Sequence, residues 1–141
     1  MRNFAIAAAT ILLVATPAQS QPRKDIDCKS QNLDTLDIAW CGRFEFDAAD
    51  AALNTLYREM IVKYDASNQA LLKTAQESWM AFRDAECTYE TNGYDGNYGA
   101  LVYHQCRTAK TKERIVVLNR QLHCEDGAYQ GETCNRPKNT P

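Results

Sequence analysis

The segment QESWMAFRDAEC, residues 76–87, brings together side chains that could bind a ligand or react. On a helix, residues three or four positions apart lie on one stripe. One stripe of this segment would therefore hold an amide, an indole, a guanidinium and a thiol, from Gln76, Trp79, Arg83 and Cys87. Such a stripe could be an active site, a site for an anionic ligand, or the polar seam of a small core.

Catalysis requires motifs that this sequence lacks, because it has no GxSxG, P-loop, GxGxxG or HExxH pattern. His104 and Cys106 could form a nucleophilic pair, but their spacing places them on different sides of a helix. A glycosidase needs two carboxyls across a sugar cleft. Several acidic residues fit solvated helix faces instead: Asp47, Glu59, Glu77 and Glu90. We therefore expect no catalytic residue, no metal and no cofactor.

A second charged residue, Asp50, also falls on an inward-facing stripe. A charge on a buried stripe must be paired, and the planar guanidinium of Arg83 suits a carboxylate. The simplest interpretation is an ion pair between Asp50 and Arg83, with Gln76 or Asn54 completing the hydrogen bonds. We call the predicted group, Asp50, Asn54, Gln76, Trp79 and Arg83, the polar seam. The alternative is a pocket in which Arg83 binds an anionic ligand.

Three amphipathic segments, residues 35–64, 69–90 and 100–122, can position this seam, because their apolar residues recur at helical intervals. The expected core positions are Leu53, Leu56, Tyr57, Met60, Ile61 and Tyr64, then Leu72, Ala75, Trp79 and Phe82, then Leu101, Val102, Ile115, Leu118 and Leu122. Ser67 or Asn68 would cap the second helix. Short connections favour antiparallel neighbours, so the predicted fold is all-α, a small antiparallel three-helix bundle.

The chain begins with features of an export signal: Arg2, an apolar run over residues 4–15, and the small residues Ala18 and Ser20. We expect a signal peptide over residues 1–20, cleaved after Ala18 or Ser20, and no membrane span after cleavage. The alternative is a retained anchor. The net charge of −2 becomes −3 without Arg2, which opposes nucleic-acid binding, since that function calls for a basic patch.

All six cysteines follow this segment, and an even number in an exported small chain predicts disulfides. Antiparallel second and third helices would bring Cys87 to the height of Cys106. Cys124 and Cys134 bracket a segment of the polar tail, residues 123–141, and could close a loop there. Cys28 would then pair with Cys41. In an alternative pairing, Cys28 or Cys41 is linked to the tail.

The connection TNGYDGNYG, residues 91–99, contains three glycines and two asparagines and is expected to be a loop. It lacks the further oxygen ligands of a calcium loop. Its two tyrosines, Tyr94 and Tyr98, lie beside Asp95 in a segment that the Cys87 disulfide would brace. Exposed tyrosines provide contact area for a protein partner at low entropic cost. The loop is therefore either a partner-binding site or a plain connector.

Three segments together resemble the LprI-type lysozyme inhibitor family, whose pattern is D-x-x-L-N-x-x-Y, then Q-x-x-W-x-x-aromatic-R-D/N-x-x-C, then T-x-x-R after a further cysteine. The matching residues are Asp50, Leu53, Asn54 and Tyr57, then Gln76, Trp79, Phe82, Arg83, Asp84 and Cys87, then Cys106, Thr111 and Arg114. The resemblance spans most of the expected domain, residues 21–122.

The resemblance implies an exported, non-enzymatic protein that blocks the cleft of a lysozyme by protein–protein binding. It transfers no catalytic residue, and no lipobox precedes Cys28, so lipid anchoring is not expected. The expected location is periplasmic or secreted. The alternative function is that of an envelope binding module for another ligand or for an effector toxin.

Overall fold

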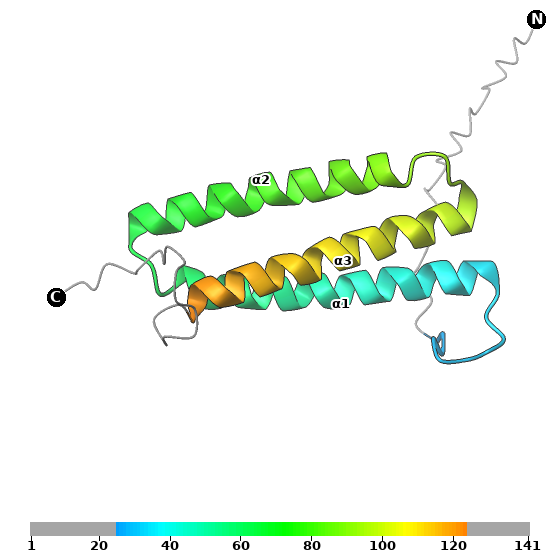
Figure 1. The fold of residues 1–141 in the computed structure, drawn as a ribbon. Helices are drawn as coiled ribbons and strands as arrows, with labels where there is room; N and C mark the ends of the chain where they lie inside the picture. Colours follow the sequence, from blue (N-terminus) through cyan, green and yellow to red (C-terminus); the bar gives the residue numbers. More distant parts are fainter. Residues whose placement is uncertain (1–24, 124–141) are drawn as a thin grey trace, which may run out of the picture.

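The computed structural model describes residues 25–123, which form three helices joined by short turns (Figure 1). The helices are α1 (Thr35–Ile61), α2 (Ala66–Glu90) and α3 (Gly96–Leu122). Helix α2 runs antiparallel to α1 and α3, so α1 and α3 are parallel to each other. The described residues contain no strand. The prediction of an all-α, antiparallel three-helix bundle is confirmed.

The helix caps explain where the helices begin. Asp34 caps α1 by accepting a hydrogen bond from the backbone N–H of Asp37 at 2.7 Å. Asp65 caps α2 in the same way through Asn68, so the prediction that Ser67 or Asn68 is the cap was wrong. An N-cap residue must stand in an extended conformation outside the helix, and Asp65 does so. Helix α3 begins at Gly96, inside the predicted loop.

The apolar core lies around Leu53, Leu56, Met60, Leu72 and Leu118. The predicted inner face of α2 was partly wrong, since Phe82 is 56% exposed and Ala75 is exposed. The buried positions of α2 are Leu72, a predicted core residue, and Gln76, Arg83 and Cys87, which were predicted to share one stripe. This face of α2 turns inward because its long polar side chains find partners on α1 and α3, as described below.

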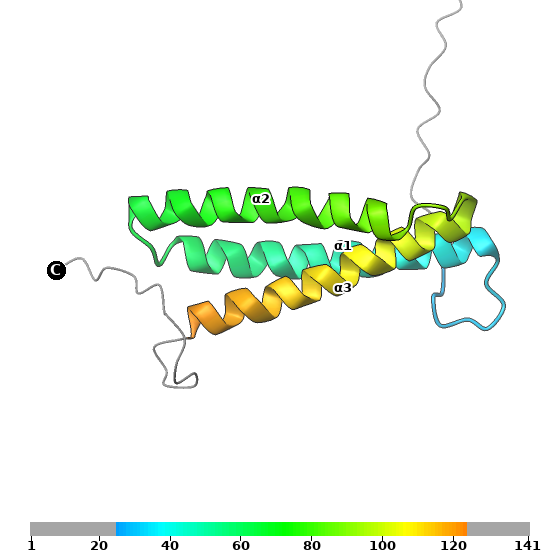
Figure 2. The same ribbon diagram turned by 45° about the horizontal axis from the view of Figure 1, so that its top comes forward.

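Helix α3 packs against α1 more extensively than α2 packs against either helix, and α3 crosses α1 at an angle (Figure 2). A Cβ added to Gly42 would lie 2.9 Å from Cδ1 of Leu101 on α3. The two helices also bury other small residues, namely Ala39, Ala49 and Thr108. Helix α1 continues through Gly42, and this glycine allows the two backbones to approach.

Two disulfides brace the bundle and match the predicted pairs. Cys87 is bonded to Cys106 between α2 and α3, and Cys28 is bonded to Cys41 between the N-terminal arm and α1. The alternative that links Cys28 or Cys41 to the tail is therefore excluded. The predicted signal peptide, residues 1–20, and the predicted tail loop between Cys124 and Cys134 lie outside the described residues. None of the three helices is long and apolar enough to cross a membrane.

Candidate functional site

Arg83 lies at the centre of the polar seam, with its side chain 4% exposed. Its Nη1 donates to Asp50 Oδ1 at 3.0 Å and to Thr111 Oγ1 at 3.2 Å, while its Nε donates to Asp84 Oδ1 at 2.8 Å. One guanidinium thus links all three helices. Because so little of Arg83 reaches solvent and its Nε and Nη1 donors are engaged, the arrangement favours structural pairing over binding of an anionic ligand.

The other residues of the polar seam contact two arginine networks, those of Arg83 and Arg114. Asn54 Nδ2 donates to Asp50 Oδ2 at 3.0 Å and so supports the Arg83 pair. Gln76 Oε1 instead accepts from Arg114 Nε at 3.2 Å, and its buried Nε2 has no partner among the described residues. The indole of Trp79 faces both guanidinium groups, at 5.2 Å from Arg83 and 5.6 Å from Arg114. Such cation–π contacts stabilise a desolvated arginine.

Sequence reasoning missed four members of this network: Asp84, Arg107, Thr111 and Arg114. Arg107 Nε donates to Asp84 Oδ1 at 2.9 Å and lies 3.7 Å from the ring centroid of Phe46. Burial, the largest single influence, raises the pKa of Asp84, but the hydrogen bonds and charges of Arg83 and Arg107 together lower it below its ordinary value. The matched family motifs contain Asp84, Thr111 and Arg114, which was the available signal.

The pKa of Arg83 is raised by its partners. Burial, the largest influence, would lower this pKa, but the hydrogen bonds and charges of Asp84 and Asp50 outweigh it. The buried charge is thus stabilised by two carboxylates. The acidic residues predicted on solvated faces pair with nearby cations: Asp47 with Arg43, Glu59 with Lys63, Glu77 with Lys73 and Glu90 with Lys110.

His104 is a partly buried titratable group between α1 and α3. Its ring stacks on Phe46 at 6.0 Å between centroids, and its buried Nδ1 has no partner among the described residues. Burial, then the charges of Arg43 and Arg107, lower the pKa of His104 despite an opposing effect of Asp47. The structure therefore favours the neutral imidazole.

This predicts that the protein loses stability as the pH falls from 7.5 to 5.0. The unfolded His104, with a pKa of about 6.5, binds a proton in this window more readily than the folded one. The free energy of unfolding, measured with urea, should fall less over this range in H104F, which retains the stacking on Phe46. The exposed histidine provides the control, because H123N should keep the full dependence. An unchanged slope in H104F would contradict the assignment.

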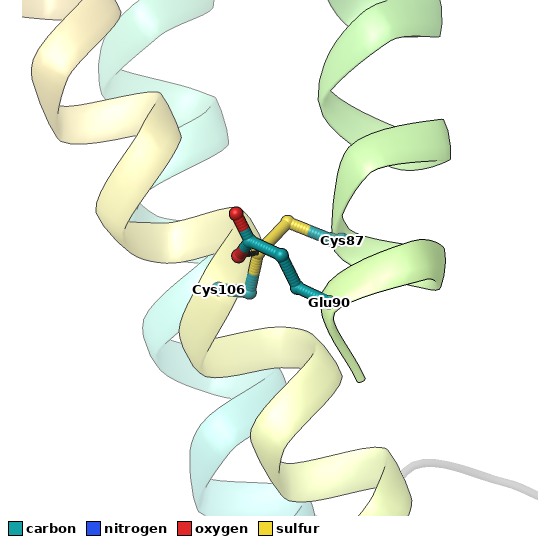
Figure 3. Close-up of side chains that lie close together, drawn as sticks. All are labelled: Cys87, Glu90 and Cys106. Atoms are coloured by element: carbon teal, nitrogen blue, oxygen red, sulfur yellow. Dashed lines mark hydrogen bonds between the residues drawn. A yellow bond between two sulfur atoms is a disulfide. The ribbon is translucent and has the colours of Figure 1, made fainter. Parts of the chain in front are cut away.

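Cys87, Glu90 and Cys106 form a compact group of potential metal ligands (Figure 3). The two sulfur atoms are bonded to each other, so neither is the thiolate that a metal requires. Glu90 Oε2 lies 3.1 Å from Sγ of Cys106, a contact without a donor hydrogen, and Glu90 Oε1 accepts from Lys110. This group is therefore a disulfide with the Glu90 carboxylate beside it, and its sulfur atoms are not available as metal ligands.

The predicted partner-binding residues lie in the α2–α3 connection and the start of α3, at the same end of the bundle as the N-terminal arm (Figures 1 and 2). Tyr94 and Tyr98 are 52% and 59% exposed, and their rings meet edge to face at 5.4 Å. Tyr98 belongs to the first turn of α3, and Asp95 is its N-cap residue. A Cβ on Gly99 would collide with the carbonyl of Tyr94, so this connection requires glycine there.

The net charge of the described residues is concentrated at this end. We define the acidic end as residues 25–37 and 91–99. It contains five carboxylates and one lysine: Asp25, Asp27, Asp34, Asp37, Asp95 and Lys29. The other described residues contain ten acidic and ten basic side chains. The bundle is therefore electrically asymmetric along its length.

Two hollows adjoin these residues. One of about 440 Å³ lies in the arm and is lined partly by carboxylates, those of Asp25, Asp27 and Asp37. The other, of about 190 Å³, lies between α1 and α3 beside Trp40 and Leu36. Asn97 also lines this groove and donates to Thr35 across the two helices at 3.4 Å. The acidic end thus combines negative charge, exposed aromatic rings and an apolar groove.

Comparison with known proteins gives a match to the family described as "Lysozyme inhibitor LprI", over residues 27–118. The chain is also similar to an uncharacterized protein of Rhizobium meliloti (strain 1021). The two are 28% identical over 134 residues, which cover 84% of this chain and 94% of that protein. No solved structure matches the chain.

Proposed function

This chain belongs to the LprI lysozyme inhibitor family, and from that premise we propose that it is an exported protein that inhibits a lysozyme by binding across the enzyme's substrate cleft. We assign the contact surface to the acidic end. The observation that supports this assignment is the charge asymmetry, because the net negative charge of residues 25–123 falls within residues 25–37 and 91–99.

Charge of this kind favours a basic partner. Complementary fields accelerate the encounter of two proteins and fix their orientation. A lysozyme of basic charge would be drawn to the acidic end in preference to the rest of the bundle, where charges balance. Exposed charges are screened within about 8–10 Å at physiological ionic strength, so inhibition should weaken as salt is added.

The exposed rings would supply the contact area. Tyr94 and Tyr98 are held edge to face, and two conformationally restricted tyrosines lose little entropy on binding. Leu36, 39% exposed, lies at the neighbouring groove. Aromatic anchors surrounded by polar residues are typical of the residues that dominate protein–protein affinity.

The buried network supports a non-catalytic role. Arg83, the strongest candidate for binding a small anion, is enclosed by Asp50, Asp84 and Thr111. Its function in this proposal is to hold α2 against the parallel pair of helices. The binding surface and the residues that identify the family are therefore different parts of the molecule.

The test is the lysis of peptidoglycan by lysozymes in the presence of the purified mature protein with its disulfides intact. We expect slower lysis, with a higher concentration needed for half-inhibition as NaCl is added. An unchanged lysis rate at large molar excess, across lysozymes of different types, would sink the proposal. The alternative, a binding module for another envelope ligand or an effector toxin, would then be pursued by pull-down from envelope extract.

Tyr94→Ala combined with Tyr98→Ala should raise the half-inhibitory concentration by roughly tenfold or more, as expected for loss of anchor residues. The matched control is V116A, because Val116 on α3 is a comparably exposed apolar side chain, at 50%, outside the acidic end and outside the outer face of α2. This control should shift the half-inhibitory concentration by less than about twofold, the scale of contacts that contribute little to affinity. Equal effects of the two variants would exclude the tyrosines as the contact.

A further inference from the structure

The outward face of α2 carries no charge over five turns. Ten residues on this face are all exposed and all uncharged: Ala70, Leu71, Thr74, Ala75, Ser78, Ala81, Phe82, Ala85, Thr88 and Tyr89. The charged residues of α2, such as Lys73, Glu77 and Glu86, lie outside it. Leu71, Phe82 and Tyr89 are 62%, 56% and 78% exposed. A large apolar surface of this kind on a soluble helix marks an interaction site.

The centre of this face has the spacing of a helix–helix seam. Successive seam positions are separated by four, three, four, three and four residues, at Leu71, Ala75, Ser78, Phe82, Ala85 and Tyr89. Alternating intervals of three and four are the heptad pattern of paired helices. The pattern is also symmetric about position 80, so it reads the same in both directions.

We propose that this face is a homodimer interface in which α2 packs antiparallel against α2 of a second copy. A two-fold interface must be self-complementary, and the spacing provides this. Phe82 would pack against the small Ser78 of the other copy, and Ala75 against its Ala85. Leu71 would contact Tyr89 of the other copy at both ends of the seam.

The charge distribution allows two copies to pair through this face and favours the antiparallel orientation. Within the seam no side chain is charged, so two copies meet no like charges there. Helix α2 ends beside the acidic end (Figure 1). A parallel pair would bring two acidic ends together, whereas an antiparallel pair places them at opposite ends of the dimer. Both acidic ends would then stay accessible.

The size of the face indicates a reversible dimer. Standard interfaces contain roughly 20–30 residues on each side, and this face has ten. The seam is about 27 Å long, from eighteen residue steps at 1.5 Å each. We expect dissociation constants on the order of 100 µM, typical of small reversible contacts.

The test is sedimentation equilibrium of the disulfide-intact mature protein up to about 1 mM. A85E, in the seam, should raise the dissociation constant at least tenfold. A109E is the matched control, because Ala109 is an equally exposed alanine on α3, and it should leave the constant within twofold. A monomer at the highest concentration, or equal effects of A85E and A109E, would overturn the proposal.

The antiparallel orientation has its own test. In this arrangement Thr74 of one copy lies near Thr88 of the other, while the two positions are about four turns, or roughly 21 Å, apart within one helix. T74K with T88K should weaken the dimer, and T74K with T88E should restore or strengthen it. Equal weakening by both pairs would overturn the antiparallel seam.

Lysozyme inhibition separates this proposal from the proposed function. A85E should lose the dimer and keep inhibition, because its substitution lies outside the acidic end. If A85E instead loses inhibition while self-association is unchanged, the face is a surface for the enzyme and the homodimer is wrong. If the unaltered protein does not inhibit lysozyme, the proposed function fails. The sedimentation experiment still decides whether the protein dimerises through this face.

Discussion

Replacing Arg83 with methionine should lower the free energy of unfolding by about 3 kcal/mol, the lower end of the range for breaking a buried ion pair. Methionine fills similar space but leaves Asp50, Asp84 and Thr111 without their shared donor. The lower end applies because the two carboxylates are 32% and 42% exposed and can recover some hydration. In a domain of this size, such a loss corresponds to a melting temperature lower by roughly 12 °C or more.

Arg43 provides the matched control for this prediction. It also forms an ion pair, with Asp47 at 2.8 Å, but both side chains are about half exposed. Exposed pairs contribute about 0–1 kcal/mol, so R43M should be close to neutral. Urea unfolding followed by circular dichroism measures both variants. If R83M loses no more than R43M, Arg83 does not hold the helices together.

Exchanging the charges of Asp50 and Arg83 would be a poor test of this ion pair. The carboxylate of Asp84 accepts a hydrogen bond from the same guanidinium, so R83D would place a new carboxylate beside an existing one. The double exchange is therefore expected to remain unstable even though the pair is real. A double-mutant cycle of R83M, D50N and their combination measures the coupling free energy between the two side chains. We expect about 0.5–3 kcal/mol, as for residues in one hydrogen-bond network.

Removing the disulfide between Cys87 and Cys106 with C87A/C106A should lower the free energy of unfolding by about 3 kcal/mol, through the entropy of the unfolded chain. Cys87 is fully buried, one turn beyond Arg83 on α2, so the bond also ties this helix to α3 at the seam. Urea unfolding measured by circular dichroism gives the loss directly.

The second disulfide supplies the control. Cys28 and Cys41 are 13 residues apart and the first pair 19, so the entropic contributions should be similar. However, Cys28 is exposed and lies in the arm, outside the core. C28A/C41A should release the arm locally, with a smaller loss in the helical transition and a larger loss of lysozyme inhibition. If C28A/C41A instead loses more unfolding free energy and less inhibition than C87A/C106A, these separate roles of the two disulfides are contradicted.

Much of the fold followed from helical periodicity, and the errors have physical causes. Phe82 was predicted on the inner face of α2 because apolar residues usually mark the buried side. The structure buries Arg83, as predicted from its pairing with Asp50, but leaves Phe82 56% exposed. The second carboxylate on Arg83, from Asp84, and the contact of Asp84 with Arg107 on α3 were not predicted, because periodicity within one helix does not contain contacts between helices.

The candidate site could likewise be predicted only in part, because some of its contacts join different helices. The pair of Asp50 and Arg83 could be inferred from two charges on inner stripes. The partner of Gln76 could not, because Arg114 reaches it from a third helix, 38 positions along the chain. Similarly, the glycines of residues 91–99 predicted a loop, whereas Gly96 and Gly99 belong to α3. Glycine is tolerated in a first turn, where helix and loop sequences look alike.

The parallel orientation of α1 and α3 has an electrostatic consequence for the acidic end. Both helices begin there, at Thr35 and Gly96. Each helix macrodipole places roughly half a positive charge at its N-terminus, next to Asp34, Asp37 and Asp95. These carboxylates are therefore stabilised by the backbone itself. The fold can concentrate negative charge at this end, where a partner would be recognised, with little loss of folding stability from repulsion among the aspartates.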